Sequence, residues 1–110
     1  MEGVSSSISL LDGSNLRGAD LKGVVLYGAL LTDTDLRGGD LTEADLSYAN
    51  MNNADLRGAD LEGADLRSAD LRDADLEEAV LRDTKGVTED LGAHAAKLEG
   101  ATMPDGSVHP

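Results

Sequence analysis

The chain has 110 residues, which is enough for one small domain, and 40% of them are hydrophobic. Because it contains no Phe, no Trp and only two Tyr, a core built on large aromatic side chains is excluded, and Leu, Ala and Val must fill the interior. A formal net charge of −13 without a basic stripe argues against direct binding to nucleic acid, and the absence of Cys excludes disulfides and thiol chemistry.

Residues 1–8 are expected to form an N-terminal tail or cap. The segment from Met1 to Asp12 has no basic region and no apolar run long enough for a signal peptide. Nothing in the sequence approaches the length of a membrane span. We therefore expect a cytoplasmic protein without membrane contact.

Residues 9–83 carry an internal repeat with a period of five. Leu or Met occupies every fifth position from 11 to 81, a small residue lies two positions earlier, and Asp or Asn usually lies between them. This period fits neither an α-helix nor a flat strand, and on a helix successive leucines would lie about 140° apart. The pattern predicts short extended segments and corners, stacked through parallel backbone ladders about 4.8 Å apart.

In each unit the small residue and the Leu are predicted to point inward, while the other three positions face solvent. Gly lies two residues after the Leu in seven units, where a corner needs unusual backbone angles. The predicted core is Leu16, Leu21, Leu26, Leu31, Leu36, Leu41, Leu46, Met51, Leu56, Leu61, Leu66, Leu71, Leu76 and Leu81.

Units such as ADLKG at 19–23, ADLRG at 54–58, ADLEG at 59–63 and ADLRD at 69–73 resemble the pentapeptide-repeat family. The resemblance covers residues 9–83. It implies an all-β solenoid, a right-handed quadrilateral parallel β-helix with four segments in each coil of twenty residues. The number of sides comes from the resemblance, because the period of five does not fix it.

Residues 84–110 break the register and are expected to form a C-terminal cap. Thr88 can N-cap a short α-helix over about 88–98. Its apolar stripe of Leu91, Ala95 and Leu98 would cover the last leucine layer and Val80. A strand-like tail follows, in which three apolar residues again lie five apart: Leu98, Met103 and Val108. This tail resembles the L-x-G-A-x-x-P-D-G ending of many cyanobacterial and plastid pentapeptide proteins.

Two sets of outward residues are candidates for a contact surface. Leu10, Val25 and Leu30 occupy positions where Asp is usual. Either Val4 and Ile8 fold back over them, or they form an exposed strip for self-association or for a partner. The second set is acidic and consists of Asp35, Asp55 and Asp75. Because Arg17, Arg37 and Arg57 flank it, it is either a self-neutralising solvated face or a binding face.

No residue pattern predicts catalysis or a cofactor. His94 and His109 have no Cys or Ser placed as a partner and no zinc spacing, and no calcium-binding or phosphate-cradling motif is present. Tyr27 and Tyr48 face outward on the same side, one coil apart, as a small contact patch or by chance exposure. We expect no enzyme activity, metal or cofactor.

The sequence therefore favours a non-catalytic structural or protein-interaction module, present as a monomer or weak homodimer, that binds protein. The alternative is an acidic mimic of DNA that binds or inhibits a DNA-binding enzyme such as a topoisomerase, as some members of the family do. Fifteen repeats weaken this alternative. They make a ladder only about 18 Å tall, a height that corresponds to about five base pairs of duplex.

Overall fold

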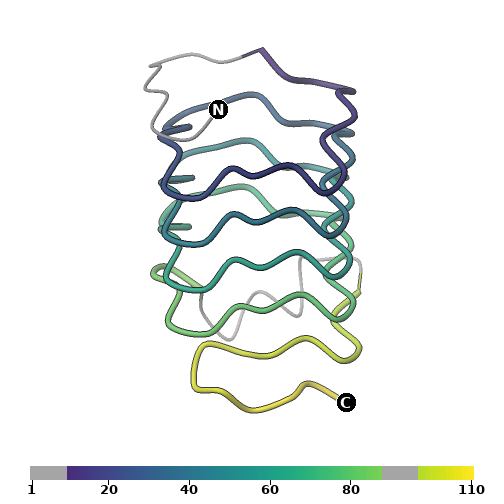
Figure 1. The fold of residues 1–110 in the computed structure, drawn as a ribbon, viewed down its shortest axis with the longest axis vertical. Helices are drawn as coiled ribbons and strands as arrows, with labels where there is room; N and C mark the ends of the chain where they lie inside the picture. The colour runs from purple at the N-terminus through teal and green to yellow at the C-terminus, as the bar shows by residue number, and fades with distance from the viewer. Residues whose placement is uncertain (1–9, 88–96) are drawn as a thin grey trace.

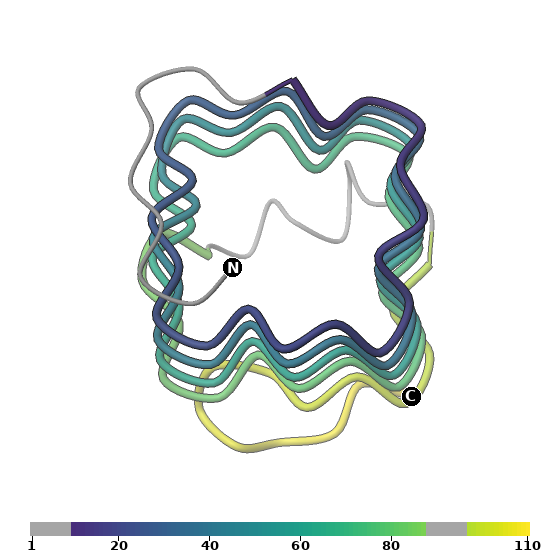
Figure 2. The same cartoon turned by 45° about the horizontal axis from the view of Figure 1, so that its top comes forward.

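The computed structural model describes residues 10–87 and 97–110, and in them the chain winds into a stack of coils (Figure 1). Seen obliquely from the top, the coils superpose as a four-sided outline (Figure 2). Parallel bridges join residues twenty apart along the stack, as in Asn15 to Asp35 and Asp35 to Asp55. In these ranges the regular structure consists of single bridged residues rather than longer strands, and they contain no α-helix.

Three backbone hydrogen bonds from each unit join one coil to the next. The Leu16 amide donates to the Asp35 carbonyl at 2.7 Å, the Asp35 amide to the Ser14 carbonyl at 2.9 Å, and the Gly18 amide to the Arg37 carbonyl at 2.9 Å. The pattern recurs on all four sides, so the walls of the tube satisfy their own polar groups.

A turn closes each unit. In the first coil the Ala19 amide donates to the Leu16 carbonyl at 3.0 Å, and Gly18 between them has a φ of 65°. The expected role of glycine at the corners is therefore confirmed. At eight other corners a residue other than Gly adopts the same left-handed conformation, at a cost of roughly 1–2 kcal/mol for each residue. These residues are Asp33, Glu43, Tyr48, Asn53, Ser68, Asp73, Glu78 and Asp83.

The core is a continuous column of leucines and small residues inside the tube. Thirteen of the fourteen side chains predicted as core are 7% exposed or less, and Leu16 in the first coil is partly buried. The small residues, such as Ala44 and Ala54, are equally buried. Only small residues fit at these positions, because the backbone turns the corner directly beside them.

At the C-terminal end the repeat resumes after an insertion of two residues. Lys97 bridges Asp75 and Thr102 bridges Val80, a separation of 22 residues instead of 20, and Leu98 is buried in the core. Residues 88–96 of the expected cap helix lie outside the described residues. The expectation that this helix extends to Leu98 is wrong, because Lys97 and Leu98 belong to the stacked ladder.

The tail then reverses direction instead of continuing the repeat. Val108 pairs antiparallel with Thr102 and is 66% exposed, so its spacing of five from Met103 does not place it in the buried column. The reversal follows Pro104 and Asp105, where Gly106 takes a φ of 88°.

This hairpin occupies the backbone groups that a further coil would use. The Gly100 amide donates to the His109 carbonyl, the Met103 amide to the Ser107 carbonyl, and the His109 amide to the Ala101 carbonyl. In the first coil the corresponding groups, such as the Gly18 amide, bond to the coil below. The hairpin thus closes one corner of the open ladder edge.

Candidate interaction surface

The outward side chains form four flat faces, each named here by its dominant residues. The arginine face comprises 15–18, 35–38, 55–58 and 75–78, and the acidic face comprises 20–23, 40–43, 60–63 and 80–83. The tyrosine face comprises 25–28, 45–48, 65–68 and 85–87. The amide face comprises 10–13, 30–33, 50–53 and 70–73. Because each face is one repeat unit wide, its composition can be read along columns of residues twenty apart.

The recurring Asp or Asn has a structural task on every face. Its Oδ1 accepts a hydrogen bond from the amide two residues later, as Asp40 does from Thr42 at 3.0 Å and Asn50 from Asn52 at 3.0 Å. This local bond stabilises the start of each turn. Much of the −13 charge therefore arises from carboxylates that hold the backbone, and Asn can replace Asp in this task.

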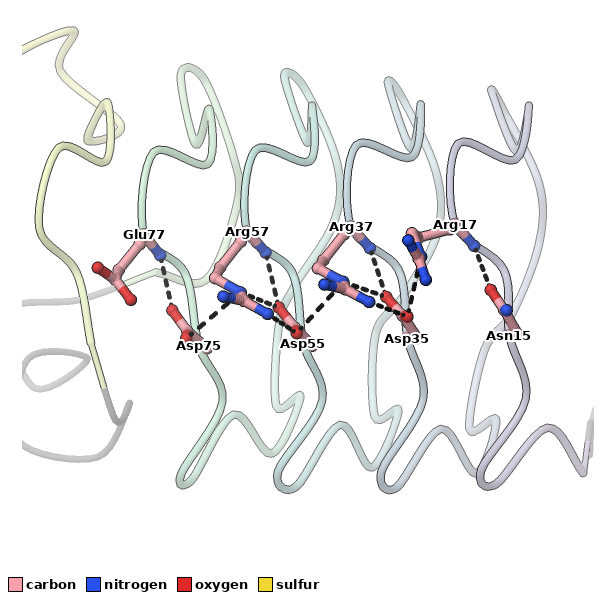
Figure 3. Close-up of polar contacts among 8 residues, drawn as sticks. All are labelled: Asn15, Arg17, Asp35, Arg37, Asp55, Arg57, Asp75 and Glu77. Carbon is pink, nitrogen blue, oxygen red and sulfur yellow. Dashed lines mark hydrogen bonds and ion pairs between the residues drawn. The ribbon is translucent and has the colours of Figure 1, made fainter.

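The arginine face is a continuous ladder of ion pairs (Figure 3). Arg37 donates two hydrogen bonds to Asp35 of its own coil, at 2.9 and 2.7 Å, and its Nε lies 3.5 Å from Asp55 of the next coil. Arg57 repeats this arrangement, with 2.9 and 2.6 Å to Asp55 and 3.7 Å to Asp75. Each arginine therefore joins two coils.

These contacts determine the protonation of the carboxylates. The side-chain hydrogen bond from Arg37 holds the pKa of Asp35 far below its usual range; partial burial opposes this shift, and the Arg37 amide and charge add to it. Arg57 lowers the pKa of Asp55 in the same way. Both groups are charged at neutral pH and already paired, so they offer little unbalanced charge to a partner.

The ladder changes at the fourth coil. Glu77 stands where the three coils above have Arg, and its pKa is raised by partial burial and by the neighbouring charge of Asp75. Lys97 lies 3.7 Å from Glu77 and partly compensates for the missing arginine.

The acidic face carries the largest unbalanced charge. It has six carboxylates against Lys22 and Arg82, a formal net charge of −4. Arg82 pairs with Glu62 at 3.3 Å. The other five carboxylates make no ion pair within the described part of the chain: Asp20, Asp40, Glu43, Asp60 and Asp83. By the same count the arginine face carries −2, the amide face −3 and the tyrosine face zero.

Apart from Val108 in the C-terminal hairpin, the large exposed apolar residues of the described chain lie in the N-terminal half of the stack. Tyr27 and Tyr48 contact each other, with ring centroids 5.3 Å apart and planes tilted by 50°. Leu10 is 75% exposed and stacks on Leu30, which is partly buried, as is Val25. Val4 and Ile8, expected as a possible cover for this strip, lie outside the described residues.

Among residues 10–87 and 97–110, no three His, Asp or Glu side chains converge as a metal site would require. Nδ1 of His109 lies 2.8 Å from the carbonyl oxygen of the neighbouring Pro110, and His94 lies outside the described residues. The described part of the chain contains no helix that could span a membrane.

Stacked coils with a leucine core and faces of paired polar residues define the class: a parallel β-solenoid that serves as a scaffold. Residues 9–47, 25–63 and 44–83 match the family model described as pentapeptide repeats. The chain belongs to this family, whose members fold as right-handed quadrilateral β-helices and are generally non-catalytic repeat scaffolds.

Solved structures of the family are similar to the chain. A pentapeptide repeat protein from the thylakoid lumen of Arabidopsis thaliana is 29% identical over 91% of this chain and 70% of that chain, with a TM-score of 0.62. A pentapeptide repeat protein from Nostoc is 33% identical over 78% of this chain and 82% of that chain, with a TM-score of 0.35. A search of curated protein sequences found no match.

The structure separates the two sets of candidate surface residues. Asp35, Asp55 and Asp75 lie together on the arginine face, whereas Leu10 and Leu30 lie on the amide face and Val25 on the tyrosine face. The contact between Tyr27 and Tyr48 could have been anticipated from their spacing of 21, because one residue beyond a full coil places Tyr48 at the corner beside Tyr27.

Proposed function

We propose that the chain is a non-catalytic scaffold that binds another protein, and that its acidic face contacts a basic surface of that partner. The main support is that ion pairs are distributed unevenly between the faces. Arginines pair with Asp35, Asp55 and Asp75 on the neighbouring arginine face, whereas five carboxylates of the acidic face make no ion pair in the described structure. Such a face attracts and orients a cationic surface.

The rigidity of the tube supports this proposal. Every coil is joined to the next by regular backbone hydrogen bonds, so the faces do not have to be ordered when a partner binds. The proposal also agrees with the common use of this family as protein-binding modules.

The experiment compares partners captured by three forms of the full chain. The acidic-face variant carries Asp20→Asn, Asp60→Asn and Glu43→Gln, and the matched control loses the same charge on the amide face through three substitutions: Asp12→Asn, Asp33→Asn and Asp73→Asn. The Asp→Asn changes of the acidic face should keep the turns, because Asn15 and Asn50 accept the same backbone hydrogen bond. We expect specific partners to bind wild type and control but not the acidic-face variant. Equal capture by all three forms would refute the role of this face.

Mimicry of DNA needs strong negative charge around more of the rod. The arginine ladder counts against it, because it pairs Asp35, Asp55 and Asp75 with cations on one side of the tube. Supercoiling by purified gyrase, with and without micromolar protein, tests this alternative directly. Inhibition or protection by wild type, lost in the acidic-face variant, would favour the mimic over the scaffold.

A further inference from the structure

We propose that the tyrosine face is a docking surface for a second copy of this chain, in an antiparallel dimer centred on Ser47. The contact uses Tyr27, Tyr48 and Arg67. It is distinct from the acidic face, so it can hold whether or not the partner proposed above exists.

The first argument is the conformation of Tyr48. Its φ is 60°, in the left-handed region that is unfavourable for residues other than Gly. In the coil above, the same corner is Gly28, with a φ of 70°. Seven other corners of the described structure adopt this conformation without Gly, and all seven carry polar side chains, so Tyr48 is the one aromatic residue among the eight. A large ring on a solvent-facing corner therefore distinguishes this position from the other corners.

The second argument is the exposure of two aromatic rings on this face. Tyr27 is 46% exposed and Tyr48 is 59% exposed, although the rings contact each other. Tyr is enriched at protein interfaces, because its ring buries apolar area while its hydroxyl keeps a hydrogen-bonding partner.

The third argument is charge. The tyrosine face is the one described face with no net charge, because Asp45 and Asp65 are balanced by Arg67 and Lys85. Two copies that each carry −13 repel each other across the other three faces. A second copy meets less repulsion at this face than at the other three, whereas a strongly basic partner would be drawn to the acidic face instead.

The column of residues on this face is self-complementary. Tyr27 lies one coil above Ser47, and Arg67 lies one coil below it. A two-fold axis across the column at Ser47 therefore places Tyr27 of each copy opposite Arg67 of the other, with Tyr48 beside the axis. Ser47 is 6% exposed, so the centre of the column is recessed between these larger side chains.

The guanidinium of Arg67 is already held in place on this face. Asp65 holds its guanidinium through Nε at 3.0 Å and Nη2 at 2.6 Å, while 66% of the side chain remains exposed. A guanidinium fixed along one edge presents its flat side to an aromatic ring, the arrangement of a cation–π contact.

The contact area predicts a weak dimer. The tube measures 24 × 22 Å across its two shorter axes. Three overlapping coils span about 14 Å, which gives on the order of 300 Å² of flat face per copy. Stable complexes bury about 800 Å² per partner. The dimer is therefore expected to be weak and reversible rather than permanent.

Sedimentation velocity of the full chain between about 10 μM and 1 mM tests the proposal, since this range brackets a weak dimer. We expect the weight-average sedimentation coefficient of wild type to rise with concentration. Tyr48→Gly and Arg67→Glu should each weaken the dimer at least about tenfold. Tyr48→Gly should also unfold at a temperature no lower than wild type, which separates loss of docking from loss of folding.

Arg72→Glu is the matched control. Arg72 holds Asp70 with the same geometry, at 3.0 and 2.7 Å, and is 63% exposed, but it lies on the amide face. This variant should associate as wild type does. A wild type that stays monomeric up to about 1 mM would overturn the proposal, as would equal weakening by Arg67→Glu and Arg72→Glu.

Discussion

Truncation of Leu56 to Ala is the most direct test of the inward leucine column. Leu56 is fully buried, and its neighbours in the coils above and below, Leu36 and Leu76, are 1% and 0% exposed. The coils are fixed by backbone ladders on all four sides, so they cannot collapse into the space that the substitution leaves. The expected loss in the free energy of unfolding is therefore at the upper end for such changes, about 3–5 kcal/mol.

That loss is large against the whole stability of a domain of this size, about 5–15 kcal/mol. Leu56→Asp would add an unpaired buried charge to the same cavity and should leave the chain unfolded. The control is Arg57→Ala, one residue further along the chain. The side chain of Arg57 is 46% exposed, and its loss should cost less than about 1 kcal/mol.

Urea titrations followed by far-UV circular dichroism measure these differences through the midpoint of unfolding. Similar midpoints for Leu56→Ala and Arg57→Ala would refute the assignment of inward and outward positions. A loss below about 1 kcal/mol for Leu56→Ala would refute the claim that the coils cannot relax around a cavity.

Three further predictions concern the ladder and the cap. The pKa values of Asp35 and Asp55 are lowered in the folded state, so their contribution to stability is complete above the unfolded pKa of about 3.9 and is lost as the pH falls below it. The urea midpoint of unfolding should therefore be level from pH 7 to about 5 and decrease at lower pH. Glu77→Arg combined with Lys97→Glu exchanges the charges of that ion pair and should raise the free energy of unfolding by up to about 1 kcal/mol, because the new arginine can hold Asp75 as Arg57 holds Asp55. A lower urea midpoint for this double variant would contradict the pairing rule read from the ladder. Removal of residues 104–110 exposes the ladder edge that the hairpin covers and should produce concentration-dependent oligomers in light scattering, whereas an unchanged monomer would show that the hairpin is not needed as a cap.

The sequence by itself determined the interior. A leucine every fifth residue and a small residue two positions earlier can be buried together only if the chain turns within each unit, so the core column and the glycine corners follow from sequence spacing alone. The same spacing predicted which residues stack, because a coil of twenty residues places Asp35, Asp55 and Asp75 in one column.

The tertiary structure decided what the spacing leaves open. The register after residue 87 shifts by two residues, and Val108 reverses into a hairpin because a turn at Pro104 to Gly106 competes with a further repeat. The pairing of each arginine with two carboxylates depends on side-chain reach between coils, which no period encodes. For the same reason the face whose carboxylates make no ion pair becomes evident only once the coils are stacked in space.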